Sequence, residues 1–110
     1  MTFAQSLTAA ARLTEATLDR ILSERSISGE APEPQAGRLI AAMRHAVLGG
    51  GKRVRPLLVI ESAALFGLPP QDAAHTAAAL ELVHCYSLAH DDLPAMDNDE
   101  LRRGQPTVWK

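Results

Sequence analysis

Acidic residues gather in one short stretch and are the first sign of chemistry in this sequence. Residues 91–100 are DDLPAMDNDE, in which the acidic positions are Asp91, Asp92, Asp97, Asp99 and Glu100. Carboxylates packed this closely repel one another, and a divalent cation removes that repulsion. Hard oxygen ligands suit Mg²⁺, Mn²⁺ or Ca²⁺. The stretch therefore predicts a metal site, with a solvated acidic loop as the alternative.

Basic residues stand on both sides of this acidic stretch. Lys52, Arg53 and Arg55 follow three glycines in GGGKRVRP (residues 49–56), and Arg102 and Arg103 come soon after the acids. Glycines let a backbone approach a phosphate closely and expose its N–H groups. Carboxylates for a metal and cations for phosphate together predict a polyphosphate substrate. An exposed turn is the alternative for the first basic group, and Arg53 has the weakest case for binding.

The segment before the acids places a histidine on the same side as the first aspartate. His84, Leu88 and Asp91 are spaced i, i+4 and i+7, so they share one helix face. His84 would lie about 10 Å along the helix axis from Asp91, which suits a second anion site. A histidine with only a structural role is the alternative. Pro94 cannot continue the helix, and a break there would bring Asp97 back towards Asp91.

Three better-known phosphate or metal motifs do not fit. A nucleotide-binding phosphate loop would need Gly at position 46 and Ser or Thr at position 53, where the sequence has Ala and Arg. A calcium-binding EF-hand loop starting at Asp97 would need Gly at position 102 and Glu at position 108. A His/Asp phosphohydrolase centre built on residues 90–92 lacks identifiable further ligands.

Helices are the elements expected to position these residues. Ala and Leu greatly outnumber Val and Ile, and aromatic residues make up 4%, which predicts an all-α chain. A first helix is expected over 3–22, with Thr2 and Gln5 forming a capping box. Others are expected around 39–47, from Pro56 to 66 and over 71–92, and 26–36 is expected to be a loop. The 57–66 segment is apolar nearly all round, so we expect it to be buried.

Composition excludes several classes of protein. A chain of 110 residues, 46% apolar and 22% charged, is one small domain or part of a larger one. It has no apolar run long enough to span a membrane and no start typical of a secretory signal, so we expect a cytoplasmic protein. Its single cysteine, Cys85, cannot form an internal disulfide and is expected to be a buried small side chain. The net charge of -2 does not favour nucleic-acid binding.

The two motifs resemble a known enzyme family. The GGGKRVRP segment and residues 81–107, with two arginines after a DDxxxxD pattern, are similar to trans-isoprenyl diphosphate synthases, and most to bacterial farnesyl diphosphate synthases. The likeness covers residues 37–110. It implies an all-α isoprenoid synthase fold with long helices around a central cavity. It also implies a prenyltransferase that condenses isopentenyl diphosphate head to tail with dimethylallyl or geranyl diphosphate, giving farnesyl diphosphate.

The resemblance also implies a role for each matching position. Asp91 and Asp97 would bind Mg²⁺ (Mn²⁺ is also possible), and Asp92 would act with them through the metal. Arg102 would hold the allylic diphosphate. The isopentenyl diphosphate would be held by Lys52, Arg55, His84 and Arg103. Tyr86, with Ser87 beside it, would limit the length of the product. Trp109 stands where relatives often have histidine and receives no role.

Relatives in this family form homodimers, are much longer and carry a second aspartate-rich motif, which residues 1–110 lack. We therefore expect this chain to be the N-terminal part of a single synthase domain, inactive and marginally stable alone. One alternative is a non-catalytic subunit that pairs with an active partner. Another is a small Mg²⁺-dependent domain that binds or hydrolyses diphosphate.

Overall fold

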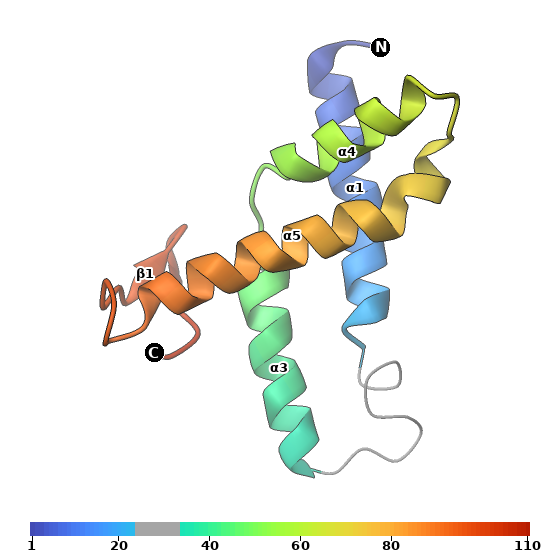
Figure 1. Cartoon of the computed structure of the whole chain (residues 1–110). Coiled ribbons are helices and arrows are strands. Elements are labelled where there is room, and N and C mark those ends of the chain that lie inside the picture. The colour runs from blue at the N-terminus through green and yellow to red at the C-terminus, as the bar shows by residue number, and fades with distance from the viewer. Residues whose placement is uncertain (24–33) are drawn as a thin grey trace.

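The computed structural model describes residues 1–23 and 34–110, and these are mostly helical (Figure 1). The helices are α1 (Phe3–Ile21), α3 (Pro34–Leu48), α4 (Val54–Ala64) and α5 (Pro70–Asp92). A short antiparallel hairpin follows, in which β1 (Leu101–Arg102) pairs with β2 (Gln105–Pro106). The all-α prediction is confirmed for the body of the chain. The hairpin, which forms directly after the acidic stretch, was not predicted.

Helix boundaries follow local sequence signals closely. The capping box of α1 is present: the Gln5 backbone N–H donates to the Thr2 hydroxyl (3.2 Å), and the Thr2 N–H donates to the Gln5 side chain (2.9 Å). The predicted loop over 26–36 is wrong at its end, because α3 already begins at Pro34. Proline suits a first helical turn, where its missing N–H is not needed. The earlier part of that loop, 26–33, lies outside the described residues.

Helix α5 lies at the centre of the packing. It contacts α4, α1 and α3, and in Figure 1 it crosses both α1 and α3. Its buried face consists mainly of small side chains, which let neighbouring backbones approach closely. One core cluster joins α1, α4 and α5 through Ala10, Leu57, Ile60, Ala73 and Ala77. A second joins α1, α3 and α5 through Leu18, Leu22, Val47, Ala78 and Cys85.

Helix α4 is buried on one side only, so the prediction of an all-round buried helix is wrong here. Leu57 and Ile60 are buried, whereas Leu58 is 61% exposed and Phe66, just beyond the helix, is 85% exposed. The physical reason is that α1 and α5 cover only one face of α4. The described residues form a flat body of 42 × 36 × 18 Å. None of their helices combines the length and the hydropathy needed to cross a bilayer.

Candidate functional site

The loop between α3 and α4, residues 49–53, has an unusual backbone. Gly50 and Gly51 have φ of 101° and 121°, and Arg53 follows with a φ of 59°. Residues with a Cβ rarely adopt a positive φ, which explains why glycine occupies positions 50 and 51. Arg53 is the N-cap of α4, and its side chain makes no capping hydrogen bond. The first N–H groups of a helix attract anions, so exposed Lys52 lies where an anion is favoured.

Three segments bring further polar groups to this loop. Arg55, in the first turn of α4, has its Nη1 3.4 Å from Nε2 of His84 on α5. Because arginine can only donate, Nε2 is the acceptor, and the neutral ring carries its proton on Nδ1. Arg103, in the hairpin turn, lies against the loop: a Cβ added to Gly51 would be 3.2 Å from its Nη2. We call Lys52, Arg55, His84 and Arg103 the cationic site.

The pKa of His84 is lowered by its surroundings. Burial lowers the pKa of His84 from its ordinary value of 6.5, and the nearby positive charges of Arg55, Arg103 and Arg102 lower it further. Glu81 acts in the opposite direction but does not balance them. His84 is therefore neutral at pH 7. An anion bound among these groups would relieve their mutual repulsion.

The acidic stretch folds back on the end of α5. The Asp97 backbone N–H donates to the carbonyl of Asp91 (2.8 Å), and that of Asp99 donates to the carbonyl of Asp92 (3.1 Å). The chain after Pro94 thus returns to the last turn of α5, as the helix break predicted at this proline suggested. The side chains of Asp91 and Asp97 are both exposed there.

These two carboxylates fit the needs of a magnesium ion. Among the described residues there is no group of three or more His, Cys, Asp or Glu side chains arranged to hold a metal. Mg²⁺, however, usually takes one or two protein carboxylates and completes its shell with water and substrate phosphate. Asp91 and Asp97 are the residues that would hold it, and this assignment stays a prediction.

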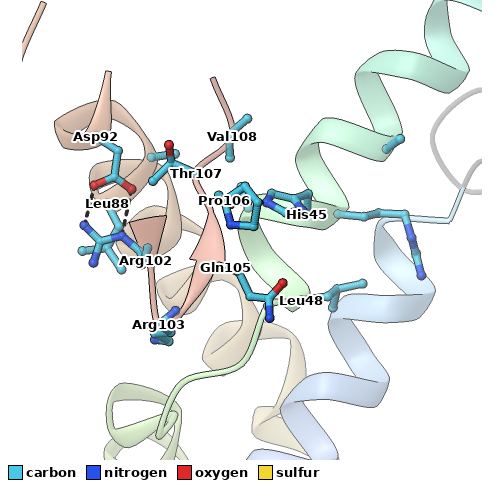
Figure 2. Close-up of a pocket in the computed structure, with 15 residues that line it drawn as sticks. His45, Leu48, Leu88, Asp92, Arg102, Arg103, Gln105, Pro106, Thr107 and Val108 are labelled. Carbon is cyan, nitrogen blue, oxygen red and sulfur yellow. Dashed lines mark hydrogen bonds and ion pairs between the residues drawn. The ribbon is translucent and has the colours of Figure 1, made fainter. Parts of the chain in front are cut away.

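Asp92 differs from its acidic neighbours because it is buried and paired. Its Oδ2 accepts from Nε of Arg102 (2.8 Å) and its Oδ1 from Nη2 (2.7 Å), as Figure 2 shows. This hydrogen bonding lowers the pKa of Asp92 and raises that of Arg102. A bidentate pair fixes the plane of the guanidinium and leaves its other edge for a second anion. The predicted action of Asp92 through a metal remains a prediction; the contact in the structure is with Arg102.

Residues after the hairpin hold the acidic stretch in place through hydrogen bonds. The Thr107 hydroxyl (2.7 Å) and the Trp109 indole N–H (2.8 Å) both donate to the carbonyl of Asp99. His45 of α3 donates from Nε2 to the carbonyl of Pro106 (2.7 Å). A cavity of about 520 Å³ lies between these elements, with His45, Pro106 and Arg103 in its wall (Figure 2). No local sequence signal pointed to Thr107 or Trp109, because their partner is a backbone carbonyl.

The alternative of an exposed turn is wrong for Arg53. Its side chain is 1% exposed rather than part of an exposed turn. It bonds Glu15 of α1, Glu81 of α5 (Nη1 to Oε1, 3.1 Å) and the carbonyl of Val47 in α3 (2.6 Å). Burial by itself lowers the pKa of Arg53, but its carboxylate partners outweigh burial and raise it. Cys85, buried as predicted, lies 3.7 Å from the same guanidinium.

The two residues assigned to product length lie on an open side of α5. The Tyr86 ring is 67% exposed and stacks on the ring of His90, with centroids 6.0 Å apart. The Ser87 hydroxyl donates to the His84 carbonyl (2.7 Å) and so stays on its own helix. Their effect on product length stays a prediction.

Comparison with known proteins identifies a family and relatives for this chain. Residues 37–110 match the polyprenyl synthetase family. The chain is 53% identical over 78 residues to a farnesyl diphosphate synthase of Haemophilus influenzae, covering 71% of this chain and 26% of that protein. It is 56% identical over 69 residues to a chloroplastic geranylgeranyl pyrophosphate synthase of Catharanthus roseus, covering 63% of this chain and 19% of that protein.

A solved structure has the same fold. The apo FPP/GFPP synthase of Zymomonas mobilis superposes with a TM-score of 0.78 at 43% identity, over 97% of this chain and 37% of that one. The chain thus spans between a fifth and two fifths of the length of these proteins. Sequence and structure agree in their assignment, and the chain belongs to the polyprenyl synthetase family.

Proposed function

We propose that the whole protein is a Mg²⁺-dependent prenyltransferase that joins isopentenyl diphosphate to dimethylallyl or geranyl diphosphate and releases farnesyl diphosphate. The observation that carries this proposal is the meeting of the glycine loop, α4 and the hairpin turn with His84 of α5, the helix whose last turn holds Asp91. The similarity to farnesyl and geranylgeranyl diphosphate synthases supports it. A homodimer in the cytoplasm is part of the proposal.

The proposed reaction needs charge stabilisation above all. The allylic C–O bond breaks and its electron pair leaves with the diphosphate. The double bond of isopentenyl diphosphate then attacks the allylic carbon, and loss of a proton restores a double bond. Arg102, oriented by Asp92, would contact the allylic diphosphate, and the cationic site would hold the isopentenyl diphosphate. Mg²⁺ at Asp91 and Asp97 would stabilise the negative charge of the leaving diphosphate.

The test is product formation by the whole protein and its variants. Incubation with isopentenyl and dimethylallyl diphosphate should give farnesyl diphosphate, and a chelator should abolish turnover. Asp91→Ala and Asp97→Ala should each lower kcat by about 100-fold or more, since one electrostatic contributor is worth about that much. Asp72→Ala, an exposed acid at the start of α5, is the matched control and should keep wild-type kcat. Unchanged turnover in both acid-loop variants would contradict the proposal.

Geranylgeranyl diphosphate is the second candidate product, favoured by the 56% identity to the Catharanthus roseus enzyme. The large exposed ring of Tyr86 favours the shorter product. Chromatography of the reaction products decides between them. Tyr86→Ala should shift the products towards longer chains. Val83→Ala, a truncation of another exposed residue on the same helix, is the comparison. The alternative of a non-catalytic subunit predicts instead that the purified native protein carries a second, active chain.

A further inference from the structure

Arg53 makes contacts that no substrate-binding role explains. It stands at the N-terminus of α4, and its buried guanidinium bonds Glu15 of α1, Glu81 of α5 and the Val47 carbonyl of α3. Arg53 therefore joins α1, α3, α4 and α5, the helices of the described residues. A buried charge is tolerated only when it is paired and hydrogen-bonded, so these contacts define its position closely.

The backbone at Arg53 needs this support. Its φ of 59° and ψ of 40° place it in the left-handed region, which costs energy in a residue with a Cβ. The conformation persists because surrounding contacts hold it. Lys52, directly before it, and Arg55, two residues after it, are exposed members of the cationic site. The backbone angles of Arg53 thus set how Lys52 and Arg55 lie relative to each other.

We infer that Arg53 is a positioning residue: it does not touch substrate, but its buried ion pairs with Glu15 and Glu81 hold Lys52 and Arg55 where they bind the diphosphate of the second substrate. The inference rests on the proposed function. It predicts that the buried contacts of Arg53 affect binding of isopentenyl diphosphate but not binding of the allylic substrate.

Steady-state kinetics of the whole protein test the inference. Arg53→Met should raise KM for isopentenyl diphosphate about tenfold, because small displacements of binding groups are costly. The KM for the allylic substrate and kcat at saturation should change by less than about twofold, since Arg102 is held separately by Asp92. Arg53→Lys keeps the charge but cannot reach all three partners, so it should fall between wild type and Arg53→Met.

Arg44 offers a matched control. It also ties α1 to α3, through an ion pair with Asp19 and a hydrogen bond to the Leu22 carbonyl (3.2 Å). Arg44→Met should lower the melting temperature without raising KM for isopentenyl diphosphate. An equal rise in KM in both variants, or a parallel loss of kcat and of both affinities in Arg53→Met, would overturn the inference. If Arg53→Met does not fold, Glu15→Gln removes a partner that is 37% exposed, and should raise the same KM about threefold.

Limited proteolysis gives a measurement that does not depend on activity. Trypsin should cut after Lys52 several times faster in Arg53→Met than in wild type, because the loop is no longer held. In Arg44→Met, trypsin should cut after Lys52 at the wild-type rate. If the wild-type protein forms no prenyl product, the proposed function fails, while cleavage still reports on the loop. Equal cleavage in wild type and Arg53→Met would overturn the inference whatever the activity.

Discussion

At the scale of single residues, the candidate site is a set of paired and unpaired charges. Asp92 and Arg102 bond each other edge to edge, and Arg53 is enclosed by two carboxylates. Within the cationic site, Lys52, Arg55 and Arg103 are positively charged, and Arg55 and Arg103 lie close enough to His84 to disfavour its protonation. In the described residues, then, the buried charges are matched within the protein, whereas those of the cationic site suit a bound anion.

The ionisation of His84 gives a first prediction. Arg55→Gln removes the second largest cause of its low pKa, so the pKa of His84 should rise. Inorganic diphosphate added to the wild-type protein should raise it too, because negative charge favours the protonated ring. NMR titration of the histidine ring protons measures both shifts. Arg12→Gln, which removes an exposed positive charge on α1, serves as control. An identical His84 pKa in all samples would contradict a cluster of positive charge around His84.

The sign of the resulting stability effect also follows. A histidine whose pKa is lowered on folding favours the native state while it is neutral. Its contribution to stability is fully present when the pH is above the pKa of the unfolded chain, near 6.5. It is lost as the pH falls below that pKa towards the lower pKa of the folded protein. The melting temperature of wild type should therefore fall more between pH 7.5 and 5.5 than that of His84→Gln. Equal falls would show that His84 carries no such contribution.

At the scale of elements, the glycine loop 49–53 and the helix α5 have different requirements. In the loop, two glycines have positive φ, but only Gly51 lies against Arg103. Gly51→Ala should raise KM for isopentenyl diphosphate, because its Cβ would meet the Arg103 guanidinium at 3.2 Å and displace it. Gly50→Ala is the matched control: its φ is also positive, but nothing lies within 4 Å of an added Cβ. Equal KM values for isopentenyl diphosphate in Gly51→Ala and Gly50→Ala would contradict a role for the contact between Gly51 and Arg103.

Helix α5 requires small residues where it packs on α1 and α4. Ala77 is fully buried among Ala10, Leu57 and Ile60. Ala77→Leu should lower the free energy of unfolding by about 1–3 kcal/mol, because added methylenes overpack a close helix contact. Ala79→Leu makes the same change at an exposed position of the same helix, so it should be nearly neutral. Chemical denaturation of the whole protein measures both, and comparable losses would argue against tight packing at Ala77.

At the scale of the whole molecule, the described chain is open and flat. Its radius of gyration is 15.3 Å, whereas a compact domain of this length would have about 13 Å. Large apolar side chains, including Leu65 and Phe66 after α4, are more than four fifths exposed. Exposed apolar side chains of this size favour contact with other protein.

A prediction for residues 1–110 produced alone follows from this surface. They should bind the fluorescent probe anilinonaphthalene sulfonate, unfold without a sharp transition and show no synthase turnover. Replacing Leu65 and Phe66 together, as Leu65→Asn and Phe66→Asn, should reduce the probe fluorescence. The exposed polar pair Arg12→Asn and Arg20→Asn is the control and should leave it unchanged. Cooperative thermal unfolding together with turnover would contradict the prediction.

Local sequence patterns were enough to predict the helices, the capping box of α1 and the return of the chain after Pro94. The reason is that helix periodicity, caps and proline breaks act between residues close in the chain. The motifs also named the cationic residues. In the structure Arg55 contacts His84 and Arg103 lies against Gly51, while the binding role of these residues stays a prediction.

Other features were decided only by tertiary structure. Whether Arg53 faces solvent depends on Glu15 and Glu81, which lie 38 and 28 residues away and belong to other helices. The separation of Asp92 from its acidic neighbours depends on where the hairpin places Arg102. The exposed side of α4 depends on which helices cover it. Each of these outcomes is a matter of desolvation and pairing between distant segments, and no local pattern of residue types encodes those contacts.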